Sequence, residues 1–218
     1  MATQFGKTWW GQEWLKSLAH IDYSNRLPRG RTYANNGSVL KLTTTGNKIY
    51  GSVQGSRRFP YRITLEVTEF SKQQKERFLD ELIGDPYLVS MLLKHDLPTS
   101  IIEVVTRHNL PLFPKTWRDL KMDCTCPDSA VPCKHIAAII YTISVEIDRN
   151  PFMLFELHGL DIPAALESRQ IAVPASAIDS IRLISDMYRD EVPVIPQSPL
   201  EKSMNPSILP GWMISWSH

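Results

Sequence analysis

Every cysteine of the chain lies in one short stretch, residues 124–135, which reads CTCPDSAVPCKH. The side chains that could bind a metal follow the pattern C-x-C, six residues, C-x-H, and they are Cys124, Cys126, Cys133 and His135. Thiolates and imidazole are the usual zinc ligands of proteins. In an extended chain, residues i and i+2 point to the same side, so Cys124 and Cys126 can aim both sulfurs at one point. The spacing therefore predicts a metal centre.

The donor set predicts one structural zinc ion. Four protein ligands close a tetrahedral site and leave no position for water or substrate. Pro127 and Pro132 bound the loop between the two pairs, and they reduce the entropy that the unfolded loop loses on closing. Three thiolates and one Zn²⁺ carry a charge of about −1, which Lys134 inside the motif offsets. Two alternatives remain open: buried cysteines beside a histidine by chance, or a redox pair in C-x-C.

The motif and its surroundings resemble the bacterial SWIM zinc finger proteins. The finger stands here as CTCPDSAVPCKH followed by IAAIIYTI, and the resemblance extends to FGKTWWGQEW, RGRTYANNG, VQGSRRFPYRI and LPLFPKTWRDLKMDCTCPD. It covers roughly residues 5–160. The resemblance implies a β-hairpin followed by a helix, which together hold one zinc, with Cys124, Cys126, Cys133 and His135 as the ligands.

The same resemblance implies contact with nucleic-acid machinery. SWIM fingers occur in proteins linked to Swi/Snf-type helicase-like ATPases, Mutator-type transposases and recombination factors, and they are regarded as DNA-binding or protein-interaction modules. The resemblance identifies no DNA-contacting residue, and it does not extend to the tail after about residue 165. The expected partners are DNA, with RNA as an alternative, and a separate Swi/Snf-type ATPase.

Helices and strands must position the motif, and a helix is predicted over residues 8–20. Trp10, Trp14 and Leu18 repeat every four residues, and Thr8 suits the N-cap. We interpret the three tryptophans of this segment, Trp9, Trp10 and Trp14, as core anchors rather than as a platform for bases. Further helices are predicted after the Ser71/Gln74 capping box, after Asp85-Pro86 and after Pro98. Residues 136–147 have helical periodicity, although their β-branched composition leaves a strand open.

Between residues 31 and 67 the pattern predicts strands. We expect them over 39–43, 49–54 and 61–67, with a turn at Thr45–Lys48 because Gly46 and Asn47 tolerate positive φ. In the last strand Tyr61, Ile63, Leu65 and Val67 alternate with Arg62, Thr64 and Glu66. Such alternation is typical of an antiparallel meander with one covered face.

The predicted fold class is α+β: an N-terminal antiparallel β meander with flanking helices, a helical middle, and then a zinc-bound β-hairpin plus α-helix. We expect an α+β domain with a basic surface over 1–70, a helical segment over 71–120, and the zinc finger with its helix over 121–165. An acidic, Pro-rich C-terminal extension or tail is expected over 166–218.

Charge is distributed unevenly, although the net charge is +1. The first 75 residues contain twelve Lys and Arg against four Asp and Glu, whereas the stretch after Met122 contains six against twelve. Such asymmetry is typical of proteins with an anionic partner. The side chains expected to contact nucleic acid are Arg29, Arg31, Arg57, Arg58, Arg62 and Lys134, since guanidinium and ammonium groups bind phosphates. For each of them, ordinary surface charge or an ion pair is the alternative.

The sequence shows no catalytic constellation. Gly6-Lys7-Thr8 resembles the end of a phosphate-binding loop, but the required glycine five residues earlier is missing. The histidines at positions 20, 95, 108 and 158 are isolated. We therefore expect no enzymatic activity and no small-molecule substrate. The expected function is a zinc-binding accessory protein that binds nucleic acid, tethers a separate ATPase to it, or both; a pure protein–protein adaptor is the alternative.

The expected compartment is the cytoplasm, including the nucleoid. The residues MATQFGKTWW lack the basic and apolar regions of a signal peptide. No apolar run reaches the ~18–20 residues of a membrane helix. Three clustered cysteines do not form the disulfide framework of a small secreted protein.

Overall fold

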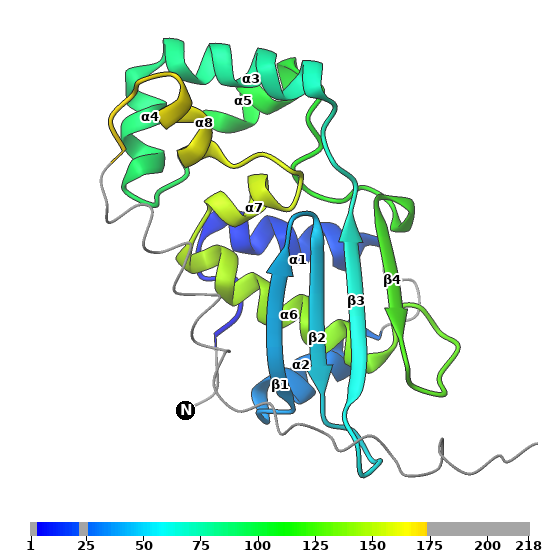
Figure 1. Cartoon of the computed structure of the whole chain (residues 1–218). Coiled ribbons are helices and arrows are strands. Elements are labelled where there is room, and N and C mark those ends of the chain that lie inside the picture. The colour runs from blue at the N-terminus through cyan, green and yellow to red at the C-terminus, as the bar shows by residue number, and fades with distance from the viewer. Residues whose placement is uncertain (1–3, 22–25, 174–218) are drawn as a thin grey trace, which may run out of the picture. The chain divides into compact units, whose positions relative to one another are not determined.

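A four-stranded antiparallel sheet lies at the centre of the fold (Figure 1). The computed structural model describes residues 4–21 and 26–173 of the chain, so the predicted tail over 166–218 lies outside the described residues from residue 174 onward. The strands, in the order in which they neighbour one another, are β1 (Val39–Thr45), β2 (Lys48–Val53), β3 (Tyr61–Val67) and β4 (Leu120–Cys124).

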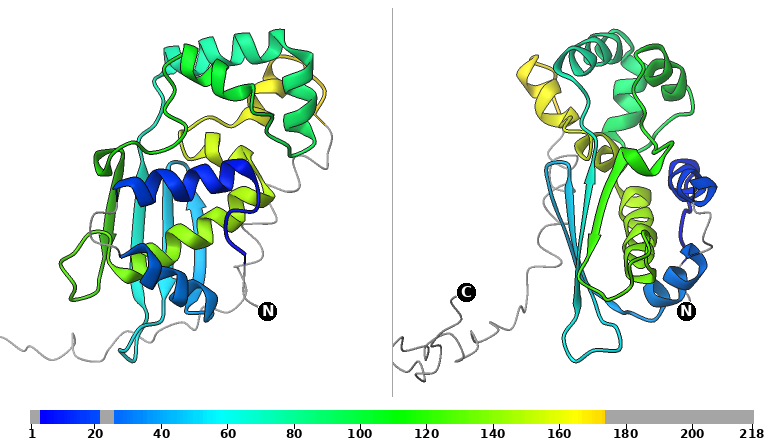
Figure 2. Two further views of the ribbon diagram at one scale, coloured as in Figure 1. Left: turned by 180° about the vertical axis from the view of Figure 1, so that it is seen from behind. Right: turned by 90° about the vertical axis from the view of Figure 1, so that its right-hand side faces the viewer.

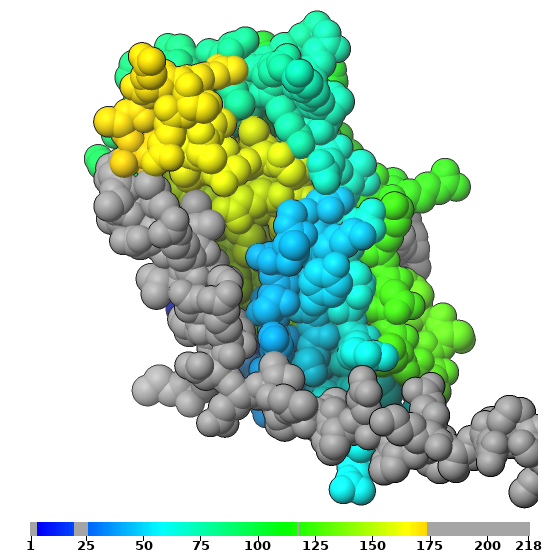
Figure 3. Space-filling model, viewed as in Figure 1, coloured from blue at the N-terminus to red at the C-terminus, as the bar shows by residue number. Residues whose placement is uncertain are grey.

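Helices cover one face of this sheet. The helices of the described residues are α1 (Trp9–Ile21), α2 (Leu27–Asn35), α3 (Lys72–Gly84), α4 (Pro86–Leu93), α5 (Ile101–Arg107), η1 (Trp117–Asp119), α6 (Lys134–Arg149), α7 (Phe152–Glu156) and α8 (Ile162–Ser168). α6 packs against all four strands, and α1 and α2 pack against α6 (Figure 2). The other face of the sheet is seen directly in Figure 3. Within the described ranges, no helix combines the length and the apolar character needed to cross a membrane.

The helix predicted over residues 8–20 is confirmed as α1. The Thr8 hydroxyl accepts a hydrogen bond from the Gly11 amide (3.1 Å) and so caps the helix. The indole N–H groups of Trp10 and Trp14 donate to carbonyl oxygens of α6, at 2.6 and 3.2 Å. Trp10 and Trp14 are buried, so the prediction that they anchor the core is confirmed for these two, whereas Trp9 is only partly buried against the core.

The predicted antiparallel meander is confirmed, and the structure adds its register. Gly46 adopts φ +56° in the turn between β1 and β2, as the sequence required. Ile49 of β2 faces Leu65 of β3, and both side chains are fully buried under α6. The capping box of Ser71 and Gln74 opens α3, and the Asp85 carboxylate caps α4.

One prediction is wrong: residues 31–35 belong to helix α2 and not to the strand region. The sequence LPRGRTYAN contains Pro28 and Gly30, which are usually helix breakers. Pro28 lies in the first turn, where its missing N–H costs no hydrogen bond. At Gly30 an added Cβ would lie 2.3 Å from the Cβ of Ala137, so glycine lets α2 approach α6 closely.

The strand of the finger joins the N-terminal meander. The resemblance implied a β-hairpin, but the described residues of the finger supply one strand, β4, which pairs antiparallel with β3. In this register Ile63 faces Cys124, so the first zinc ligand sits at the end of the central sheet. The predicted buried helix over 136–147 is confirmed within α6. The segment boundaries at residues 70, 120 and 165 stay predictions.

Candidate metal centre

The four predicted ligands come together between β4 and α6. Cys124 ends β4, Cys126 follows it, Cys133 is the N-cap of α6, and His135 lies in the first turn of that helix. Their ligand atoms all lie within 4.8 Å of one another. The distance from the His135 Nδ1 is 3.8 Å to the Cys133 Sγ and 4.0 Å to the Cys124 Sγ. Tetrahedral zinc with ordinary bond lengths separates nitrogen and sulfur ligands by about 3.6 Å.

The histidine ligand is held in place by aromatic rings. Tyr61 of β3 lies 4.5 Å from the His135 ring, and Tyr33 of α2 meets it edge-on at 5.5 Å. The imidazole is only 3% exposed. Its Nδ1 faces the sulfurs, while its Nε2 is buried without a hydrogen-bond partner in the described residues. A buried imidazole whose Nδ1 contacts the sulfurs of Cys124 and Cys133 suits a metal ligand.

The electrostatics of the thiols also suit a cation. The hydrogen bond with Cys124 lowers the pKa of Cys133 to about 5, and the backbone N–H groups of Ile136 and His135 at the start of α6 act in the same direction. The same bond with Cys133, together with burial, raises the pKa of Cys124. The cluster therefore holds one thiolate readily but resists further negative charge. A divalent cation would offset this negative charge and so allow further thiols to lose their protons. The residues present therefore fit one structural zinc in a Cys₃His site.

The loop between the ligand pairs is tied to helix α2. The Asp128 carboxylate accepts a hydrogen bond from the Arg26 guanidinium at 3.1 Å, immediately before α2 begins. Its other oxygen accepts from the Ala130 amide. α2 thus supports the finger twice, through this ion pair and through the Tyr33 ring on the histidine ligand.

The structure places the six predicted nucleic-acid contacts around the same end of the sheet. Arg29 and Arg31 lie on α2, Arg57 and Arg58 on the loop from β2 to β3, Arg62 at the start of β3, and Lys134 at the start of α6. Direct contacts link these elements to the finger. Thr125, between two ligands, accepts from the Arg62 amide through its hydroxyl and donates its own amide to the Arg62 carbonyl.

Three of these cations lie over aromatic rings. Lys134 lies 5.0 Å from the centre of the Tyr33 ring, and the Arg57 guanidinium lies 5.9 Å from the Tyr61 ring, so both cations border the two tyrosines that pack on the zinc ligand. Arg58 lies 5.7 Å from the Phe59 ring. We call the surface of α2, the 54–60 loop, Arg62 and Lys134 the finger-end surface.

The Gly-Lys-Thr motif has a structural explanation. The backbone amides of Lys7 and Thr8 donate to the Asp148 carboxylate of α6 at 2.7 and 2.9 Å, and the Thr8 hydroxyl bonds the same group. An internal carboxylate thus occupies the position that an anion would take at the start of α1. The motif fastens α1 to the end of α6.

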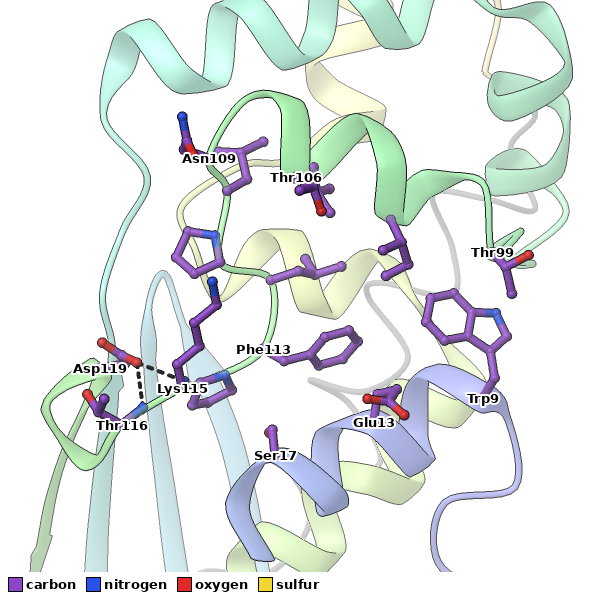
Figure 4. A pocket seen from close by; sticks show the side chains of 16 residues that line it. Trp9, Glu13, Ser17, Thr99, Thr106, Asn109, Phe113, Lys115, Thr116 and Asp119 are labelled. Carbon is purple, nitrogen blue, oxygen red and sulfur yellow. Dashed lines mark hydrogen bonds between the residues drawn. The ribbon is translucent and has the colours of Figure 1, made fainter. Parts of the chain in front are cut away.

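An apolar groove of about 880 Å³ lies between α1, α5 and the connection that follows α5 (Figure 4). Trp9 and Glu13 of α1, Ile102 and Val105 of α5, and the connection over residues 109–116 line it. The Asp119 carboxylate accepts from two backbone amides of that connection and fixes its course. No local sequence pattern indicates this groove, because its walls come from three separated segments.

Comparison with known proteins agrees with the metal centre. Residues 111–144 match the SWIM zinc finger family. The chain is 35% identical over 187 residues to the uncharacterized protein Rv2102 of Mycobacterium tuberculosis, an alignment that covers 84% of this chain and 68% of the relative. No solved structure matches the chain.

Proposed function

The chain contains a SWIM zinc finger and belongs to one family with the uncharacterized protein Rv2102 of Mycobacterium tuberculosis, and from this premise we propose that it is an accessory protein that binds nucleic acid, DNA in the first place, through its finger-end surface. The zinc ion in this proposal is structural. It holds the end of β4 against the start of α6, and it thereby fixes the surface that surrounds them.

The observation that carries this proposal is the convergence of cations on the finger. Arg57 and Arg58 lie exposed on one loop, and the exposed side chains of Arg29 and Arg31 lie on α2. Both elements reach the zinc ligand His135 through a tyrosine ring, Tyr61 for the loop and Tyr33 for α2. Because phosphate contacts supply most of non-specific nucleic-acid affinity, such a surface suits the backbone of DNA.

Fluorescence anisotropy with labelled DNA tests the proposal. Each phosphate contact contributes about 0.9 to the slope of log K against log salt on duplex DNA. The double variant Arg57→Gln/Arg58→Gln should therefore reduce the magnitude of the slope by up to about 1.8. The matched control is Lys72→Gln/Arg77→Gln, which removes two exposed cations from α3 and should leave the slope unchanged. Absence of measurable affinity at low salt would count decisively against the proposal.

The apolar groove supports a second candidate function, that of a protein adaptor. Trp9 and Phe113 offer half-buried rings 6.4 Å apart, and Ile102 beside them is 37% exposed. A groove of this kind suits an apolar segment of another protein, which we propose to be a separate Swi/Snf-type ATPase. In co-purification, Ile102→Glu should lose the ATPase while DNA affinity is retained. Recovery of the native protein without a stoichiometric partner would contradict this second function.

We propose that the protein is a binding platform and not an enzyme. Two histidines of the described residues have structural surroundings: His108 bonds the Glu81 carboxylate at 2.6 Å, and His158 stacks on Phe70 between backbone carbonyls. Burial lowers the pKa of His158, so its neutral form is favoured. We also propose a reducing, cytoplasmic location, where three thiols stay available to zinc.

A further inference from the structure

The face of the sheet opposite α6 is not covered by any helix of residues 4–21 or 26–173, and it is seen from the front in Figure 3. Its side chains form three rows across the strands. The middle row is Thr43, Tyr50, Thr64 and Asp123; the row nearer the finger is Lys41, Ser52 and Arg62; the far row is Lys48, Glu66 and Lys121. We call this surface the open face.

An aromatic ring lies near the centre of the open face. Tyr50 of β2 is 43% exposed, and its neighbours in the row are the short side chains Thr43 and Thr64. A planar ring beside short neighbours leaves room for another planar group to stack on it. Nucleic-acid bases stack on such rings regardless of sequence, because every base has a π-face.

The charges on the open face favour an anionic ligand. It carries four cations against the two acids Glu66 and Asp123. Glu66 is already bound by Lys121 at 2.9 Å and Lys48 at 3.5 Å. In the row nearer the finger, Lys41 and Arg62 form no ion pair with any carboxylate of the described residues. These two cations lie on the strands that flank β2, one row nearer the finger than Tyr50, so backbone phosphates on the finger side of a base stacked on Tyr50 can reach them.

The open face continues into the finger-end surface. Tyr50 lies three residues before Val53, where β2 ends, which is about 10 Å along a strand. Beyond that point the loop presents Phe59, which is 63% exposed, with Arg58 over its ring. Two exposed aromatic rings with cations between and beside them form one path along the sheet.

Such a path fits a single strand better than a duplex. In a duplex the bases are paired and stacked on each other, so only their edges are available to a protein. A single strand can turn its bases out onto aromatic side chains, and open four-stranded sheets with central aromatics bind RNA in this way in other proteins. A duplex could use the cations, but it could not stack on Tyr50.

We infer that the open face binds single-stranded nucleic acid, with a base stacked on Tyr50 and phosphates on Lys41 and Arg62, and that the strand continues toward Phe59. This inference rests on the proposed function and deepens it, because it states which form of nucleic acid the surface prefers. Phosphate contacts at Arg57 and Arg58 serve both forms, whereas the Tyr50 contact serves the single strand alone.

The test compares Tyr50→Ala with the matched control Tyr87→Ala in the zinc-loaded chain of 218 residues. Tyr87 is 58% exposed but lies on α4, away from the sheet. The probes are fluorescein-labelled oligo(dT) and oligo(rU) of about twelve nucleotides and a DNA duplex of equal length. Zinc content and far-UV circular dichroism establish that each variant is folded.

The expected result is that wild type binds single strands more tightly than duplex. Loss of one base stack should weaken single-strand binding by Tyr50→Ala about 5- to 150-fold, with duplex affinity within about twofold of wild type, and Tyr87→Ala should change neither. A difference between oligo(dT) and oligo(rU) then identifies DNA or RNA as the ligand. If duplex binding depends on Arg57 and Arg58 while Tyr50→Ala has no effect on single strands, the proposed function stands and this inference is overturned. If no probe binds wild type, the proposed function itself fails.

Discussion

Replacement of Gly55 by alanine should weaken zinc binding although residue 55 is not a ligand. Gly55 lies in the loop after β2, where an added Cβ would lie 2.4 Å from Cε2 of Tyr61 and 3.0 Å from Nε2 of His135. Ordinary contact begins at 3.4 Å, so the Tyr61 ring must shift by about 1 Å and the imidazole by about 0.4 Å. Zinc–ligand distances tolerate about 0.2 Å. The methyl group therefore strains the metal-bound arrangement.

The size of the effect follows from the cost of overpacking. Extra methyl groups in a filled site typically cost about 1–3 kcal/mol. If metal release relieves this strain, zinc affinity falls by the same free energy, and about 1.4 kcal/mol corresponds to a factor of ten. We expect the dissociation constant for zinc to rise by about 5- to 150-fold.

Competition with a chromophoric chelator at neutral pH measures this constant. The matched control is Gly84→Ala, because an added Cβ at the end of α3 meets nothing within 4 Å. Gly84→Ala should keep the wild-type zinc affinity. If Gly55→Ala binds zinc within twofold of wild type and of this control, the packing of Tyr61 on His135 does not support the metal centre as described.

Two further predictions concern α7 and α1. Burial, and to a lesser extent the nearby negative charge of Asp161, raises the pKa of Glu156 from 4.5 to about 7. The native state therefore binds this proton more tightly than the unfolded chain. The free energy of unfolding consequently falls as pH rises from 4.5 to 7. In urea unfolding, Glu156→Gln should gain roughly 3 kcal/mol over wild type above pH 7 and nothing below pH 4.5, and equal stability throughout would contradict it. Asp148→Ala removes the acceptor of Lys7 and Thr8 and should cost about 2–3 kcal/mol of unfolding free energy at saturating zinc; an unchanged unfolding midpoint would show that this contact does not stabilise α1.

Much of the fold could be predicted because its signals are local. The periodicity of Trp10, Trp14 and Leu18, the alternation from Tyr61 to Val67 and the caps at Ser71 and Asp85 each lie within a few residues. Helix α2 could not be predicted in this way. Pro28 and Gly30 are helix breakers in isolation, and their helix depends on α6, about a hundred residues later. The short helices α7 and α8 were likewise not predicted, because five and seven residues show no clear period.

The metal ligands were predictable for a similar reason. Cys124, Cys126, Cys133 and His135 lie within one short stretch, and donor type alone restricts their chemistry. The supports of the site were not predictable, because Tyr33, Gly55 and Tyr61 approach His135 from distant segments. The pairing of β4 with β3 joins residues about sixty positions apart, and no local pattern in either strand specifies its partner.

The most direct test of the account is the metal content of the purified, untagged protein, measured by inductively coupled plasma mass spectrometry. We expect one zinc per chain, held by the Cys₃His cluster. Cys133→Ser, or chelation of the wild type, should remove the zinc and lower the unfolding free energy together. A fully folded protein without metal, whose stability does not change with chelator, would contradict the claim that these four side chains hold a structural zinc.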